Sequence, residues 1–189
     1  MRPGQLAAVV TYLEMRRPPQ PLPVGANSGL AIERLHQPDL ERYRRLFRAV
    51  GEDSLWSSRL RLDDAALAAA IRHPAVNVSA LRLAGGDKGL LEIDFRPAPD
   101  AELVFLGVTR DLIGQGAGRF LLAHALAHAW ARPIERLLVH TCTLDHPRAI
   151  EFYLKAGFIA YQQAIEITPD PRLTGLLPTT AAPHIPLIA

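Results

Sequence analysis

The chain has 189 residues, of which 49% are hydrophobic and 21% are charged, and its formal net charge is +2. This composition is typical of a globular protein with enough apolar residues for one sizeable core, so we predict a single domain over residues 1–189. The small net charge and the scattered arginines argue against nucleic acid as a partner.

Cys142 is the only cysteine in the sequence. The chain can therefore form neither an internal disulfide nor a multi-cysteine metal site, which is compatible with a reducing, cytoplasmic location. The apolar run over residues 6–13 is too short and too interrupted to cross a membrane. We accordingly expect no signal peptide and no membrane partner.

The first predicted elements are two strands, over residues 9–15 and 30–35. Residues 17–23 between them form a proline-rich connector, because proline is excluded from helix interiors and from central strands. Residues 1–29 are thus predicted to be an N-terminal strand followed by this connector.

Two helices follow in the prediction. The first begins at Pro38 and Asp39, carries apolar residues at helical spacing, and stops at Gly51. The second begins at Asp63, a favourable N-cap residue, and ends before Pro74.

The next predicted strands form a hairpin. They cover residues 76–83 and 89–96, and a turn over residues 85–87 joins them. The run over residues 102–108 is nearly continuously apolar and rich in β-branched and aromatic side chains, which predicts a further, buried strand.

Three alternating glycines, Gly114, Gly116 and Gly118, follow this strand and open a helix predicted over residues 116–130. Glycine lets the backbone bend sharply and lets an anion approach N–H groups that no helical carbonyl satisfies. The helix dipole adds to the attraction. The order of strand, glycine loop and helix therefore predicts a phosphate-binding site.

Two common nucleotide-binding patterns do not fit this loop. A Walker motif requires Lys followed by Ser or Thr after its last glycine, and neither follows Gly118. A Rossmann motif requires the spacing Gly-x-Gly-x-x-Gly, whereas these glycines are spaced two and two.

The remaining predicted elements alternate between strand and helix. Residues 136–141 form a strand parallel to residues 102–108. A helix over residues 147–156 carries Glu151 and Lys155 as an i,i+4 pair, and a strand over residues 158–168 completes a mixed sheet.

The glycine loop and the segment from Asp145 to Phe158 together resemble the GNAT superfamily of acetyl-coenzyme A dependent N-acyltransferases. The first motif of that family is Gln/Arg-x-x-Gly-x-Gly/Ala, and the second is a helix with the pattern Ala-x-x-x-Tyr-x-x-x-Gly-Phe. The match covers residues 102–161. It implies an α/β (α+β) fold with a twisted, mixed central sheet flanked by helices, in which two splayed parallel strands form a coenzyme A cleft.

The sequence departs from the family pattern at three places. Ile113 stands where the family prefers Gln or Arg, His146 replaces the usual Asn, and the region before Leu30 is longer than in a minimal member. We expect Ile113 to weaken the site less than loss of a glycine would, since relatives use mainly the main-chain N–H at that position.

The resemblance implies acetyl-coenzyme A as cosubstrate and no metal. The pantetheine arm of the cosubstrate would hydrogen-bond along Leu106, Gly107 and Val108. Gly107 either leaves room for the cofactor or accommodates curvature of the sheet. His146 could contact coenzyme or substrate, or could simply start its helix. The implied pyrophosphate cradle consists of Ile113, Gly114, Gln115, Gly116, Ala117, Gly118 and Arg119.

Acyl transfer from a thioester to an amine needs a neutral amine, stabilisation of the developing oxyanion and protonation of the departing thiolate. Tyr153 matches the family tyrosine that lies near the coenzyme sulfur, although it could also pack in the core. Glu102 matches the glutamate that takes the amine proton in histone-type members, often through water. Glu92 and Asp94 on a neighbouring strand are alternative bases. Carboxylates at such positions are more commonly exposed to solvent at the edge of a strand.

The sequence says less about the roles of the histidines and the location of the acceptor site. His124 and His128 lie four residues apart, but the glutamate and third ligand of a zinc site are missing, so we expect them at the surface. His140 could face the reaction centre or the core. In this family the loop between the first two helices often recognises the acceptor, so Trp56 and Arg59 could line a pocket, while Trp56 could equally anchor packing.

Five prolines in the C-terminal arm, residues 168–189, predict extended backbone, and we hypothesise that the arm exchanges contacts in a homodimer. The sequence thus predicts an N-acetyltransferase that moves an acetyl group to an unidentified primary amine by direct attack in a ternary complex. The alternatives are a non-catalytic acyl-coenzyme A binding or sensing module and a cofactor-free interaction domain.

Overall fold

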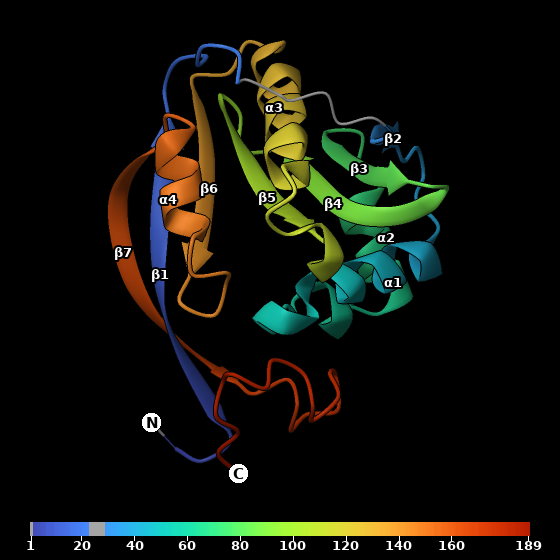
Figure 1. Cartoon of the computed structure of the whole chain (residues 1–189), viewed down its shortest axis with the longest axis vertical. Coiled ribbons are helices and arrows are strands. Elements are labelled where there is room, and N and C mark those ends of the chain that lie inside the picture. The colour runs from blue at the N-terminus through green and yellow to red at the C-terminus, as the bar shows by residue number, and fades with distance from the viewer. Residues whose placement is uncertain (1, 23–28) are drawn as a thin grey trace.

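The structure, a computed structural model of the chain, describes residues 2–22 and 29–189. A seven-stranded mixed sheet in the order β2-β3-β4-β5-β6-β1-β7 carries helices on both faces (Figure 1). This confirms the expected α/β architecture. The strands are β1 Gln5–Met15, β2 Ala31–Arg34, β3 Val76–Leu83, β4 Gly86–Asp94, β5 Asp100–Val108, β6 Arg136–Cys142 and β7 Ile159–Pro169.

The four α-helices confirm the helices expected from the sequence. They are α1 Leu40–Gly51, α2 Asp64–Ile71, α3 Ala117–Trp130 and α4 Ala149–Lys155. Asp39 and Asp63 cap the first two as expected, because their carboxylates accept from the N–H groups of Arg42 and Ala66, each at 2.8 Å. Residues 16–22 form neither helix nor strand, as predicted for the connector, and residue 23 lies outside the described residues.

The N-terminal strand β1 lies inside the sheet, between β6 and β7, and runs antiparallel to both. It begins at Gln5, four residues earlier than expected. Leu13 and Met15 at its far end are buried in the core that α3 and α4 cover. The first strand of the sequence therefore joins the last two strands into one half of the sheet.

One predicted boundary is confirmed, and one falls at a slightly different residue. The first helix ends at Gly51 as expected, and the 3-10 turn Glu52–Ser54 follows it directly. A Cβ on Gly51 would lie 2.5 Å from Trp56, so this glycine makes room for an aromatic ring. The β3–β4 turn lies at Ala84 and Gly85, both at positive φ, one residue before its expected place, because a two-residue hairpin turn needs two such residues.

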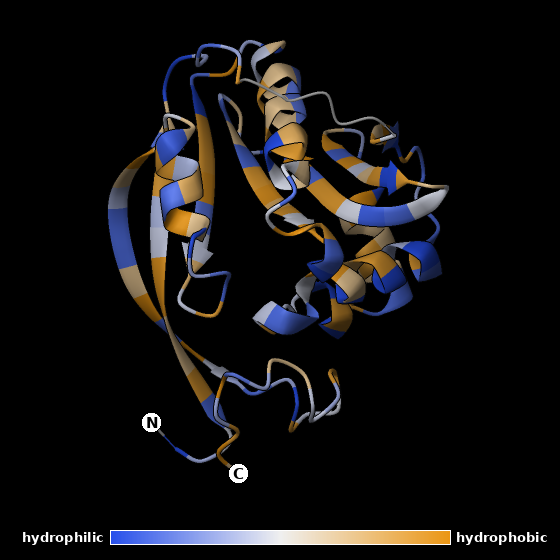
Figure 2. Cartoon of the chain, in the orientation of Figure 1, coloured by the Kyte–Doolittle hydropathy of each residue, from blue (hydrophilic) through white to orange (hydrophobic). Residues whose placement is uncertain are grey.

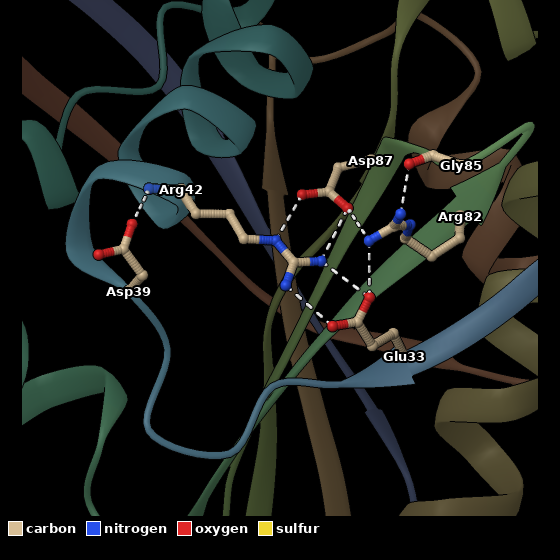
Figure 3. A network of polar contacts seen from close by, with 6 residues as sticks. All are labelled: Glu33, Asp39, Arg42, Arg82, Gly85 and Asp87. Atoms are coloured by element: carbon tan, nitrogen blue, oxygen red, sulfur yellow. Dashed lines mark hydrogen bonds and ion pairs between the residues drawn. The ribbon is translucent and has the colours of Figure 1, made fainter.

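A charged network fastens α1 to the edge of the sheet (Figure 3). The Arg42 guanidinium donates to Asp87 on β4 and to Glu33 on β2, each at 2.8 Å, and Arg82 on β3 also donates to Glu33. These hydrogen bonds raise the pKa of Arg42, with Asp87 contributing most, and hold the pKa of both carboxyls below their usual range. One guanidinium thereby ties the helix to two strands.

The sheet separates two hydrophobic cores. One lies under α3 and α4, and the other lies under α1 and α2. Along the strands, hydrophobic and hydrophilic residues alternate, as Figure 2 shows. This alternation is the pattern expected when opposite faces of a strand meet different surroundings.

The two central parallel strands diverge. Asp100, Ala101 and Glu102 of β5 pair with Arg136, Leu137 and Leu138 of β6, and beyond these pairs the strands separate (Figure 1). β5 remains paired with β4 up to Val108, and β6 remains paired with β1 up to Cys142. The splayed pair implied by the family resemblance is therefore present.

The C-terminal arm folds back on its own chain through a series of turns, so the expectation of extended backbone was wrong. Arg172 and Asp170 form a buried ion pair at 2.7 Å, and the Arg172 guanidinium also donates to the carbonyl of Ile185 at 2.8 Å. Leu177 and Ala182 are buried in the core under α1 and α2. The arm satisfies these contacts within one chain, and the homodimer stays a prediction.

We expect Arg172→Met to lower the free energy of unfolding by about 3 kcal/mol or more, because it leaves Asp170 charged and buried without its partner. Arg16→Met is the matched control, since Arg16 pairs with Glu14 at the surface and its loss should change the free energy of unfolding far less. Urea denaturation of both variants measures the difference. Equal losses would show that the pair does not hold the arm.

Candidate active site

A cleft of about 1170 Å³ opens where β5 and β6 diverge. Its walls come from the outer part of β5, the glycine loop, the end of β6, α4 and the loop that follows α1. The C-terminal arm adds Pro183 and His184, and β7 adds Glu166 and Thr168. The cleft therefore joins the predicted phosphate site to the face of the sheet on which the arm lies.

The glycine loop has the geometry of an anion cradle. Gly114 and Gly116 have φ values of +82° and +83°, in the left-handed region that favours glycine. Gly116 is the N-cap of α3 and offers no side-chain acceptor to the first helical N–H groups. These groups, on Ala117, Gly118 and Arg119, are free of a capping side chain and fit a pyrophosphate.

Several basic side chains line the cleft. Arg119 is exposed next to the cradle, and Ile113, at the position where the family prefers Gln or Arg, is also exposed. The Gln115 side chain turns back to the Asp111 carbonyl. The other Arg and Lys residues that line the cleft are Arg61, Arg110, Arg148 and Lys155, and the sequence motifs indicate none of them as a site residue.

The strand edge expected to meet pantetheine lies along the cleft. Leu106, Gly107 and Val108 pair with β4 on one side and line the cleft. A Cβ on Gly107 would lie 2.5 Å from Val50 and 3.2 Å from Trp56. Glycine at this position therefore makes room for α1 and Trp56, a reason that the sequence did not reveal.

Tyr153 both lines the cleft and packs in the core. It lies on α4, lines the cleft and is 7% exposed, while its ring packs edge-on against Phe158 and Phe152 with centroids 5.7 and 5.3 Å away. Burial, and to a lesser extent the charge of Asp145, raises the pKa of Tyr153 well above its ordinary value. The phenol is thus protonated at neutral pH and can donate a hydrogen bond.

Trp56 reaches across the cleft to Asp145. Its indole Nε1–H donates to Oδ1 of Asp145 at 3.0 Å, and the other carboxylate oxygen accepts from the Thr141 hydroxyl at 2.8 Å and from the Cys142 N–H at 2.9 Å. The indole also packs on Phe105 with ring centroids 5.1 Å apart. Trp56 therefore both lines the cleft and anchors packing, and it ties the loop after α1 to the end of β6.

Three predicted substrate residues lie elsewhere. Arg59 forms an ion pair with Glu92, which is 1% exposed and also accepts a hydrogen bond of 2.6 Å from the Tyr43 hydroxyl. Asp94 is 7% exposed and accepts from the Arg96 N–H at 2.8 Å. These carboxylates are buried and partnered, and neither they nor Arg59 are among the described residues that line the cleft.

Glu102 and His140 meet where the two strands begin to diverge. Glu102 belongs to the last pair that joins β5 to β6, and its Oε1 lies 3.3 Å from Nδ1 of His140. His140 lines the cleft, which answers the question that its spacing left open. Contact with Glu102 raises the pKa of His140, and the charges of Glu166 and Asp145 raise it further against the effect of burial.

The other histidines differ in their surroundings. His146 lines the cleft, and its Nδ1 accepts from the Arg148 N–H at 3.2 Å, so it also supports the start of α4. His124 is exposed on α3, as expected, but His128 is half-buried and contacts the Asn77 side chain. Among residues 2–22 and 29–189, no group of three or more potential ligands could hold a metal ion. No described helix is long and apolar enough to span a membrane.

Solved structures share this fold. An aminoglycoside acetyltransferase from an uncultured soil metagenomic sample matches with a TM-score of 0.60 and 20% identity, covering 75% of this chain and 96% of that one. GCN5-related N-acetyltransferases match with TM-scores of 0.63 for Sphaerobacter thermophilus and 0.56 for Kribbella flavida. Their identities are 13% and 14%, with 88% and 91% of this chain covered.

The present chain spans 52% of the Sphaerobacter protein and 63% of the Kribbella protein. It spans 64% of a functionally unknown conserved protein from Staphylococcus epidermidis, with a TM-score of 0.58, 12% identity and 88% of this chain covered. A search of curated proteins gave no match. The sequence model of the acetyltransferase (GNAT) family matches residues 32–158, which is more than half of the chain. The chain therefore belongs to the acetyltransferase (GNAT) family.

Proposed function

We propose that the protein transfers an acetyl group from acetyl-coenzyme A to a primary amine by direct attack in a ternary complex. The observation that carries this proposal is the single cleft between β5 and β6, which is lined by both the glycine cradle and Tyr153. A pyrophosphate at the cradle and a thioester beside Tyr153 would occupy two parts of one continuous space. The amine would enter from the end lined by β7 and the C-terminal arm.

The cleft offers different charges to the two substrates. The N–H groups of Ala117, Gly118 and Arg119 would hold the pyrophosphate, together with the neighbouring basic side chains. Leu106 and Val108 would hydrogen-bond with pantetheine through their backbones along the free edge of β5. At the other end, Glu166 supplies a carboxylate that favours a cationic acceptor approaching the cleft.

The chemical step needs no covalent enzyme intermediate. The amine nitrogen attacks the thioester carbonyl carbon, the C–S bond breaks, and its electron pair leaves on sulfur. Tyr153 gives its phenolic proton to the departing sulfur, and the amine proton leaves toward Glu102 and His140 at the strand divergence. The protonated group on that side then gives its proton to water, and Tyr153 takes a proton from water, so both residues return to their starting states.

Cys142 supports direct attack over a relay through an enzyme thioester. It is the one cysteine in the sequence and lines the cleft. Burial, followed by the charge of Asp145, raises the pKa of its thiol to about 11. The thiolate, which is the nucleophilic form, is therefore scarce at neutral pH.

The function is tested with a panel of amines and acetyl-coenzyme A. The panel contains sisomicin, spermidine, L-lysine and a lysine-containing peptide; sisomicin is included because a structure of the similar aminoglycoside acetyltransferase holds it. We expect at least one amine to accelerate release of coenzyme thiol. Heat of acetyl-coenzyme A binding without thiol release for any amine would favour the non-catalytic sensing module instead.

Replacing Tyr153 by Phe should lower kcat by about 100-fold, because general acid catalysis contributes at least this much in comparable reactions. The ring packing against Phe158 is kept, so coenzyme affinity and unfolding free energy should change little. Steady-state kinetics and calorimetry measure these quantities. An unchanged kcat would remove Tyr153 from the mechanism.

Replacing Gly114 by Ala should weaken binding of coenzyme A by about 10-fold, because an L-residue in the left-handed region costs about 1–2 kcal/mol and displaces the cradle. Gly175→Ala is the matched control, since Gly175 also has a positive φ with open space around it, but lies in the C-terminal arm. Titration calorimetry compares the two variants. If both bind coenzyme A equally well, the loop is not the cradle.

A further inference from the structure

Of the contacting pair Glu102 and His140, only His140 is among the described residues that line the cleft. Glu102 contacts the Nδ1 atom of the imidazole. We infer that His140, oriented by Glu102, is the base that takes the proton from the attacking amine. This inference rests on the proposed function, and it specifies which side chain accepts the amine proton.

The backbone fixes the relative positions of the two side chains. Glu102 pairs with Leu138 across the last parallel rung, and His140 lies two residues further along β6, on the same face of the strand as Leu138. The distance of 3.3 Å joins Oε1 of Glu102 to Nδ1 of His140. Because both residues lie on paired strands, their relative placement depends on no loop.

This contact selects the tautomer that a base needs. When Nδ1–H donates to the Glu102 carboxylate, the lone pair of the neutral imidazole resides on Nε2. The His140 side chain is 45% exposed, and that of Glu102 is 34% exposed. Nε2 is thus the atom that receives the amine proton, while Glu102 stabilises the imidazolium that forms.

The groups around His140 strengthen it as a proton acceptor. Glu102 on β5, Glu166 on β7 and Asp145 after β6 all raise its pKa, while burial lowers it. The Tyr12 ring on β1 packs against the imidazole with centroids 5.8 Å apart. The proton moves from the amine nitrogen to Nε2 as the carbon–nitrogen bond forms, and then passes to water at the mouth of the cleft.

The direction of the pH dependence follows from this assignment. Only neutral His140 accepts a proton, so kcat/KM should rise with pH through the pKa of His140, which lies above its ordinary value. Glu102→Gln removes the charge that stabilises the imidazolium. The inflection of the same profile should therefore move to lower pH in this variant.

The test measures pH profiles of kcat/KM on the full chain, with acetyl-coenzyme A and the fastest amine of the panel. His140→Gln should abolish this inflection and lower kcat by about 100-fold. His124→Gln is the matched control, because His124 is exposed on α3 and should leave the profile unchanged. The ionisation of the amine itself is common to all variants and cancels in the comparison.

A second readout does not depend on turnover. NMR titration of the histidine rings should assign His140 by its absence in His140→Gln and show its pKa falling in Glu102→Gln. An active wild-type protein whose His140→Gln variant keeps the inflection and its kcat would overturn the inference while leaving the proposed function intact. A wild-type protein that acetylates no amine in the panel would overturn the proposed function and the inference together.

Discussion

The divergence of β5 from β6 is the constraint on which the rest of the structure depends. Three residue pairs hold these parallel strands together, and each strand then continues against its other neighbour. β4 hydrogen-bonds to one edge of β5, and β1 hydrogen-bonds to one edge of β6. The sheet can therefore open between β5 and β6 without losing these outer ladders. The opening brings the glycine cradle, Tyr153 and His140 to one cleft.

Contacts outside the strand ladders also join the two halves of the sheet. Beyond the shared strand pairs, the hydrogen bond from Trp56 to Asp145 links the α1 side to the end of β6. The C-terminal arm, fixed by the buried pair of Arg172 and Asp170, closes the same side with Pro183 and His184. A ligand that entered the cleft would meet a wall built from the loop after α1 and the C-terminal arm.

Sequence periodicity and capping residues predicted the elements well, since Asp39, Asp63 and the alternating glycines act through their immediate neighbours. Contacts between distant segments were not predictable. No local sequence pattern indicates that β1 lies between β6 and β7. Nor does one indicate that Glu92 forms an ion pair with Arg59, or that His140 contacts Glu102. Such pairings depend on strand order and register, which single residues do not encode.

A structure of the complex with coenzyme A tests the central claim most directly. The account predicts the pyrophosphate at the N–H groups of Ala117, Gly118 and Arg119, with pantetheine lying between β5 and β6 along Leu106 to Val108. Coenzyme A bound elsewhere, with the space between the two strands left empty, would contradict it.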